Sequence, residues 1–196
     1  MAARAFLFDI DGTIWDSFPW YASVLSQQGA LEYNQALDML THGKSVARLL
    51  RSNEITPTRF KITCSNGMNH AVTYPGVHPT LRKLKGLGIP MSIVTSLPIW
   101  MVDPILGLLG ISEYFRGVVG YGDTSMHKPH PAPLLKALKY LGLSASKDIW
   151  YVGDTEGDLN AARAVGLSFA SALYGRGFPF EKANASLTKF SGILDL

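Results

Sequence analysis

Two aspartates separated by a single residue, Asp9 and Asp11, carry the strongest chemical signal in the sequence. They directly follow the short apolar run 4–8, which we expect to form a buried strand. Side chains two residues apart on a strand lie on the same face, so these two carboxylates could converge on one reacting centre. Charged groups at the end of a buried strand are costly unless they are paired or bind a cation. The adjacent Gly12 permits a ligand to approach the backbone closely.

A second acidic pair, Asp154 and Asp158, follows the apolar run 148–152. We expect Asp154 at the end of a strand and Asp158 in the first turn of the next helix. Together with Asp9 they could form an all-oxygen site of the kind that Mg²⁺ prefers, completed by water and substrate oxygens. The sequence contains no cluster of Cys and His that would indicate zinc instead.

Three further residues have groups suited to binding an anion. Lys128 lies between turn-forming residues in the stretch 127–131, where its ammonium could offset the charge of a carboxylate and a phosphoryl group. Thr95 and Ser96 follow the apolar run 90–94, and small hydroxyls and N–H groups at a strand end before a helix suit a phosphate. Each feature alone is typical of a cap, a turn or a solvated charge. Their order along the chain and their common position at strand ends indicate one site.

The elements that must position these residues alternate along the chain. Apolar runs that predict strands lie at 4–8, 90–94, 117–120, 148–152 and 167–172. Apolar spacings of three and four residues predict helices at 79–86, 99–109, 132–141 and 157–165. This alternation predicts an α/β fold, a Rossmann-like, doubly wound parallel sheet covered by helices on both faces. The ligand site of such a sheet lies at the carboxyl ends of its strands.

The stretch 16–75 interrupts the alternation with helical patterns at 18–28, 32–41 and 44–52. We therefore expect a core made of 1–15 and 76–196, and a small α-helical cap of 16–75 inserted after the first strand. Such an insert is a candidate lid over the site. Residues 61–73 give no clear pattern, and Trp15 adds bulk that we expect to narrow the entrance.

Composition sets wider limits on the kind of protein. The 196 residues are 47% hydrophobic and 17% charged, which is typical of a globular domain. A net charge of +3 with scattered Lys and Arg argues against a nucleic-acid partner. The one cysteine, Cys64, excludes a disulfide within the chain; we expect it to be a small, partly buried side chain in a reducing compartment. With no apolar stretch long enough for a membrane helix and no signal peptide, we expect a cytoplasmic protein without a membrane partner.

Taken together, the motifs resemble those of the haloacid dehalogenase superfamily. Within it, the sequence is similar to phosphatases with a helical cap, of the phosphoglycolate phosphatase and β-phosphoglucomutase type. Residues 9–17 resemble the first motif, Thr95 the second, Lys128 the third and residues 153–158 the fourth. The resemblance covers nearly the whole chain, and it implies a Mg²⁺-dependent phosphatase that acts on a small phosphorylated metabolite.

The resemblance also implies a role for each motif residue. Asp9 would attack phosphorus and form an aspartyl-phosphate. Asp11 would protonate the leaving oxygen and then activate water. The metal would be held by Asp9, the backbone carbonyl of Asp11, Asp154 and Asp158. The phosphoryl oxygens would be held by Thr95, by Lys128 and by N–H groups near Gly12 and Ser96.

Several alternative reactions can be weighed on the same residues. Asp11 disfavours dehalogenation, because an alkoxide leaving group needs an acid and a halide does not. Phosphonate hydrolysis would need a cap lysine of lowered pKa, and neither Lys44 nor Lys61 has a sequence environment that indicates one. A phosphosugar mutase and a non-catalytic binding protein on the same scaffold both stay open.

The specificity residues are expected in the insert. Residues 42–45 resemble the cap loop that meets the leaving group in relatives. Lys44 and Arg48, on one helix face, could bind a second anionic group such as a carboxylate, or could be a solvated basic face. The sequence leaves the substrate and the oligomeric state open.

Overall fold

The computed structural model describes residues 3–44, 46–56, 58–61, 63 and 71–196. The chain divides into two compact units, Met1–Trp15 with Thr73–Leu196 (unit 1) and Asp16–Val72 (unit 2). The division expected from the sequence, 1–15 with 76–196 and 16–75, differs from these limits only at 73–75. Cys64 and most of the unassigned stretch 61–73 lie outside the described residues.

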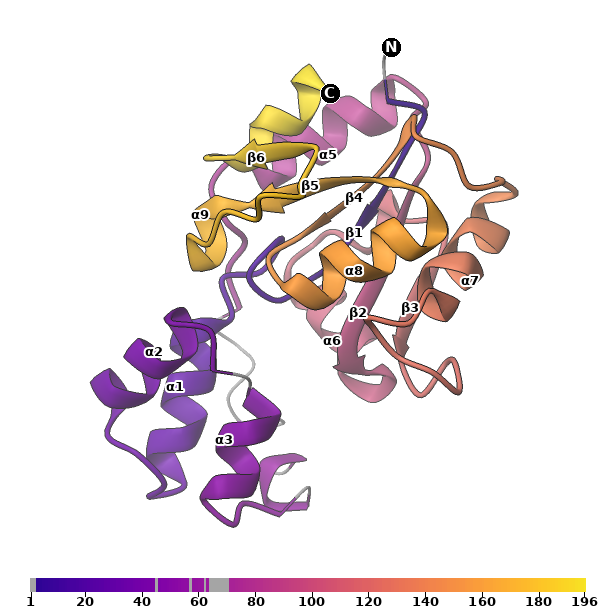
Figure 1. Ribbon diagram of the computed structural model, residues 1–196. Helices are drawn as coiled ribbons and strands as arrows, with labels where there is room; N and C mark the ends of the chain where they lie inside the picture. The colour runs from indigo at the N-terminus through magenta and orange to yellow at the C-terminus, as the bar shows by residue number, and fades with distance from the viewer. Residues whose placement is uncertain (1–2, 45, 57, 62, 64–70) are drawn as a thin grey trace. The chain divides into compact units, whose positions relative to one another are not determined.

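Unit 1 is built on a six-stranded sheet in the order β3-β2-β1-β4-β5-β6, and every neighbouring pair is parallel (Figure 1). This confirms the predicted doubly wound α/β fold. The strand β6 was not predicted, because three residues with a single buried side chain produce no apolar pattern. The strands are β1 (Ala5–Phe8), β2 (Met91–Pro98), β3 (Val118–Tyr121), β4 (Ile149–Gly153), β5 (Ser168–Ala172) and β6 (Ala185–Leu187).

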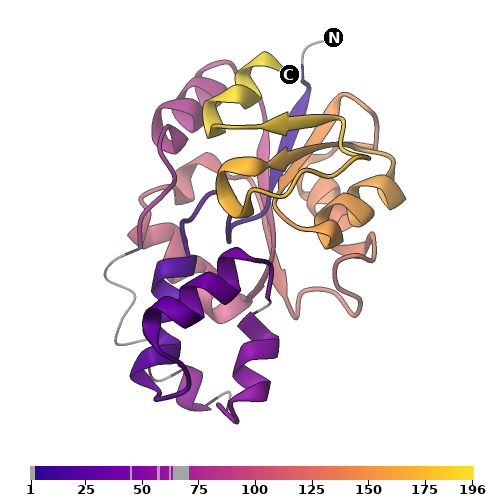
Figure 2. The same cartoon turned by 60° about the vertical axis from the view of Figure 1, so that its left-hand side comes forward.

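Helices cover both faces of this sheet, as Figures 1 and 2 show from two directions. One face carries α7 (Ala132–Leu141) and α8 (Glu156–Val165), and the other carries α5 (Val77–Gly86) and α6 (Ile99–Leu108). The C-terminal 3₁₀-helix η3 (Phe190–Asp195) packs beside α5. The shorter elements of unit 1 are η2 (Ser112–Tyr114) and α9 (Leu173–Arg176).

Strand β1 lies in the middle of the sheet and is buried throughout, which explains its apolar sequence. All four of its residues are buried, and it pairs with β2 on one side and with β4 on the other. A parallel strand that is covered on both faces must be apolar throughout, so it appears as an unbroken hydrophobic run. The chain moves from β1 to β2 in one direction and later returns to β4 on the opposite side. The carboxyl ends of β1 and β4 therefore flank a reversal of strand order, which is where sheets of this type bind ligands.

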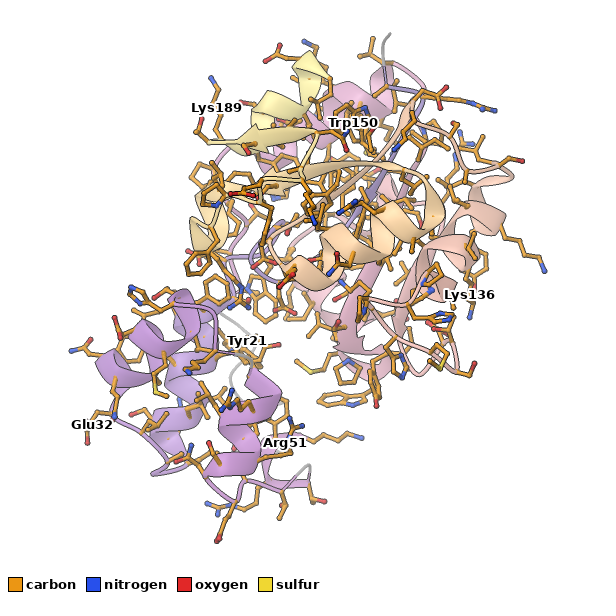
Figure 3. The ribbon with its side chains drawn as sticks, viewed as in Figure 1. Tyr21, Glu32, Arg51, Lys136, Trp150 and Lys189 are labelled. Atoms are coloured by element: carbon orange, nitrogen blue, oxygen red, sulfur yellow. The ribbon has the colours of Figure 1, made fainter. Side chains whose placement is uncertain are left out.

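The helices α1 (Phe18–Gln27), α2 (Tyr33–Thr41) and α3 (Val46–Ser52) belong to unit 2. Helices α1 and α2 pack against each other. Tyr21, labelled in Figure 3, stacks its ring on that of Phe60 with 6.4 Å between the ring centroids. Buried aliphatic side chains add to a small core, among them Leu25, Ala36, Leu40 and Leu49. Among the helices that the structure describes, none has the length and apolar character needed to cross a membrane.

The expectation that Trp15 narrows an entrance is wrong. Its side chain is fully buried, and its backbone forms bridges with Asp11 and Thr73. The reason is the turn after β1, where the Trp15 N–H donates to the carbonyl oxygen of Ile10 at 2.9 Å and brings the chain back on itself. Trp15 is therefore part of the packing that supports the turn.

Candidate active site

Three buried carboxylates meet at the carboxyl end of the sheet. Asp9 directly follows β1, Asp154 directly follows β4, and Asp158 lies in the first turn of α8. One oxygen from each can be chosen so that all three lie within 4.8 Å of one another. The Asp154 Oδ1 atom is buried and has no hydrogen-bond partner among the described residues. Buried carboxylates at this spacing repel one another and need positive charge, so the donor set fits a hard divalent cation.

The start of α8 fixes the position of Asp158. Thr155 caps the helix: its side chain accepts the Asp158 N–H, and its own N–H donates to Asp158 Oδ2 at 3.1 Å. Gly153 makes room for this arrangement, because a Cβ atom there would lie 2.7 Å from the Asp158 side chain. The end of β4, the helix cap Thr155 and the Asp158 carboxylate therefore form one local unit. Because all of these residues lie close together in the chain, a short sequence motif is enough to encode the unit.

Lys128 supplies positive charge inside the site. Its ammonium lies 2.7 Å from Asp158 Oδ1 and 3.1 Å from Asp9 Oδ1, and its side chain is only 6% exposed. Burial by itself lowers the pKa of Lys128, but the carboxylates of Asp158 and Asp9 outweigh it and hold this pKa above its usual value. The lysine is therefore charged at neutral pH, and it offsets part of the negative charge around Asp9.

Tyr151 is a member of this network that the sequence analysis missed. Its hydroxyl accepts a hydrogen bond from Lys128 at 2.9 Å. Its single proton lies within reach of two acceptors, Asp158 Oδ1 at 2.8 Å and the Val94 carbonyl oxygen at 2.9 Å. A tyrosine inside a run expected to be buried was the available signal, since a buried phenol needs a polar partner. The sequence does not say which partner that is.

A second unpredicted contact comes from α9, which follows β5. Arg176 Nε lies 2.6 Å from Asp154 Oδ2, with both side chains largely buried. Two residues earlier, the Tyr174 hydroxyl donates to the Thr13 carbonyl oxygen at 2.9 Å. No motif or apolar spacing marks this segment, so sequence reasoning had no signal for it.

The electrostatic balance of the carboxylates favours binding a proton or a cation. Burial raises the pKa of Asp9 well above its usual value; Lys128 opposes this, and Asp158 and Asp154 add to it. Burial likewise raises the pKa of Asp154 to about 7, with Arg176 lowering and Asp158 raising it. A divalent cation would remove the need for these protons.

The structure changes the interpretation of Thr95 and Ser96. Strand β2 does not end there but continues to Pro98, and α6 begins at Ile99, so Ser96 is not at a strand end before a helix. The pairing of β2 with β3 shifts register between Val94 and Pro98, and β2 extends beyond the residues that pair with β1. Thr95 is buried and its Oγ1 accepts the Leu97 N–H at 3.1 Å, whereas Ser96 is exposed.

The turn after β1 uses an N–H group that was expected to meet a phosphate. The Gly12 N–H donates to the Trp15 carbonyl oxygen at 3.0 Å, so this N–H already has a partner within the turn, and the phosphate contact expected from N–H groups near Gly12 stays a prediction. Gly12 adopts a φ of +70° within this turn. Asp11, on the same turn, is half-buried.

Lys44 and Arg48 belong to unit 2, and both are exposed. The idea that they share one helix face is wrong. Lys44 lies between the helices, where its N–H donates to the Met39 carbonyl oxygen at 2.9 Å and closes α2, while Arg48 lies on α3. Of the two residues, only Arg48 therefore has a helical position.

Comparisons with known proteins show which family the chain is similar to. The profile of the family described as haloacid dehalogenase-like hydrolase matches residues 6–172. A phosphoglycolate phosphatase of Pectobacterium atrosepticum is 32% identical over 217 aligned residues, which cover 100% of this chain and 92% of that protein. A phosphoglycolate phosphatase of Yersinia pestis is 33% identical over 195 residues, covering 89% of this chain and 82% of that one.

Solved structures give the same result for the fold. A crystal structure described as a predicted phosphoglycolate phosphatase from Haemophilus somnus 129pt superposes with a TM-score of 0.80 at 28% identity. The match covers 98% of this chain and 97% of that one. These findings confirm the resemblance that the four motifs carry.

Proposed function

The chain belongs to the haloacid dehalogenase-like hydrolase family and is a phosphatase, and we propose that it hydrolyses its phosphomonoester through attack by Asp9 on phosphorus. One observation carries this proposal. Asp9 Oδ1 is held 3.1 Å from the Lys128 ammonium, inside the cluster formed with Asp154 and Asp158. A carboxylate kept beside positive charge in a buried site can act on an anionic ester that would otherwise repel it.

Mg²⁺ is the proposed cofactor, held by the carboxylates of Asp9, Asp154 and Asp158 with the backbone carbonyl of Asp11. When bound, it would supply the charge that lets an anionic nucleophile and a phosphate lie together. Lys128 would neutralise the charge that remains on Asp9 and Asp158. Asp11, two residues after the nucleophile, would donate a proton to the leaving oxygen and then accept one from water.

The proposed substrate is a small phosphorylated acid, with phosphoglycolate as the first compound to test, because the relatives from Pectobacterium and Yersinia are named for it. Unit 2 would act as a cap, and its exposed basic side chains Lys44 and Arg48 are the candidates for binding the carboxylate of such a substrate. Thr95 would contact the phosphoryl group.

Hydrolysis of p-nitrophenyl phosphate with Mg²⁺, followed by a panel of phosphorylated metabolites, tests this function. We expect turnover that stops on chelation of the metal, and the highest kcat/KM for a small phosphorylated acid. Preferential transfer to a sugar phosphate instead of water would identify a mutase. Absence of turnover with every ester would contradict the proposal.

The Asp11→Asn variant should separate the two chemical steps. p-Nitrophenolate leaves without a proton, so this ester should still phosphorylate the protein and release a burst of nitrophenol. Steady turnover should then fall by about 10²–10⁴-fold, because no base activates water. An alkyl phosphate should give no burst. Rapid-mixing kinetics would measure both, with Asp103→Asn on the exposed part of α6 as the matched control. A kcat equal to that of the control would contradict the role of Asp11.

Metal binding should depend on pH through Asp154. Burial raises the pKa of Asp154 to about 7, so below pH 7 the apparent Mg²⁺ affinity should fall by up to about tenfold per pH unit.

Without metal, the folded chain binds the Asp154 proton more tightly than the unfolded chain. The Asp154 contribution to stability is therefore lost as pH rises from its usual pKa of 3.8 through about 7. The rise in Tm on adding Mg²⁺ should thus be larger at about pH 8 than at about pH 6. Equal rises would contradict this prediction.

A further inference from the structure

The segment formed by Tyr174, Gly175 and Arg176 joins two parts of the site that are far apart in sequence. Its first residue donates a hydrogen bond to the Thr13 carbonyl oxygen at 2.9 Å. Its second residue lies directly against the turn after β1, because a Cβ atom on Gly175 would come 1.9 Å from the Gly12 carbonyl oxygen. The segment is therefore fixed to the turn that also carries Asp11, and its third residue projects from this fixed base.

Arg176 distinguishes the two oxygens of Asp154. Its Nε lies 2.6 Å from Oδ2, with the Arg176 side chain 12% exposed and that of Asp154 1% exposed. The other oxygen, Oδ1, is buried and accepts no hydrogen bond from any residue that the structure describes. One oxygen is thus occupied by a guanidinium, and the carboxylate cannot rotate without breaking a charged, buried hydrogen bond.

This difference matters for the choice of metal. Mg²⁺ requires near-ideal octahedral geometry and takes single oxygens from carboxylates, whereas the larger Ca²⁺ accepts two oxygens from one carboxylate. We propose that Arg176 is a positioning residue that makes Asp154 a one-oxygen ligand and thereby favours Mg²⁺ over Ca²⁺. This inference rests on the metal site of the proposed function, and it adds a determinant of selectivity to it.

The ratio of the two metal dissociation constants isolates this effect. Removing Arg176 also removes a positive charge from the site and alters the proton affinity of Asp154. Both changes act on two ions of the same charge in the same direction, so they largely cancel in the ratio Kd(Ca²⁺)/Kd(Mg²⁺). Freeing Oδ2 does not cancel, because it offers Ca²⁺ a second oxygen that Mg²⁺ does not use.

Isothermal titration of the metal-free full chain with Mg²⁺ and with Ca²⁺ tests the inference without any assay of activity. In Arg176→Gln the ratio should fall by about tenfold, the lower end of effects seen when a partner of a metal ligand is removed. Arg82→Gln, at an exposed position on α5, is the matched control and should leave the ratio unchanged. Circular dichroism would verify that each variant is folded.

An unchanged ratio in folded Arg176→Gln, or an equal fall in the Arg82→Gln control, would overturn the inference while the proposed function stands. If Arg176→Gln does not fold, Arg176→Met decides by the same measurement, since its aliphatic side chain retains part of the packing but offers no donor to Oδ2. A fall in its ratio supports the inference, and an unchanged ratio overturns it. Failure of the unaltered chain to bind Mg²⁺ would overturn both the inference and the proposed metal site.

Discussion

Replacing Asp9 by asparagine is expected to lower kcat by on the order of 10⁴-fold or more, which is typical of losing a nucleophile. Asparagine has nearly the shape of aspartate, but its neutral amide oxygen cannot form the acyl-phosphate that the proposed reaction requires. The measurement is kcat with p-nitrophenyl phosphate at saturating Mg²⁺. Trapping the phosphorylated protein during turnover, which should succeed only when Asp9 is present, would identify the attacked residue directly.

The same variant should keep its fold, and this separates lost chemistry from lost structure. Burial raises the pKa of Asp9 well above its usual value, Lys128 opposes this, and the neighbouring carboxylates add to it, so a negative charge on Asp9 is costly in the metal-free protein. Lys128 would keep Asp158 as its ionic partner at 2.7 Å, so a neutral amide in place of Asp9 should leave the metal-free Tm nearly unchanged. Asp103→Asn, on the exposed part of α6, controls for the substitution itself. An Asp9→Asn protein with full activity would exclude the proposed nucleophile.

Replacing Lys128 by methionine should have the largest effect on stability. Asp9 and Asp158 would stay buried without the ammonium that now lies 3.1 Å and 2.7 Å from them. Removing one partner from a buried ion pair typically costs about 3–5 kcal/mol. We expect a loss of this size in urea unfolding without metal, and a smaller loss at low pH because protonation neutralises the carboxylates. Activity should fall as well, since the charge on Asp9 would no longer be balanced.

Lys136 provides the matched comparison for this experiment. It projects from α7, as Figure 3 shows, and pairs with Asp123 at 3.2 Å, where the two side chains are 28% and 25% exposed. Ion pairs of this kind contribute about 1 kcal/mol or less, so Lys136→Met should be nearly as stable as the unaltered chain. It should also keep its kcat. Equal losses of stability in the two variants would contradict the assignment of Lys128 to a buried charge network.

The sequence by itself determined the fold class, the family and the positions of the central acidic residues along the chain. Strands β1 and β4 are buried on both faces, so they appear as apolar runs that end in Asp9 and Asp154. The group around Asp158 could be inferred because a strand end, a helix cap and a carboxylate lie within six residues. Structural features formed by residues close together in the chain can therefore be recognised from the sequence.

The tertiary structure alone decided which partners complete the site. Tyr151 meets Lys128 across 23 positions of sequence and Arg176 meets Asp154 across 22, and contacts over such separations leave no spacing or periodicity to detect. The hydrogen-bond partners of backbone groups are likewise decided by the tertiary structure. The Gly12 N–H closes a turn, because hydrogen-bond partners depend on how the chain folds back and not on residue type. The acidic residues are therefore encoded locally, whereas the groups that orient them are selected by packing.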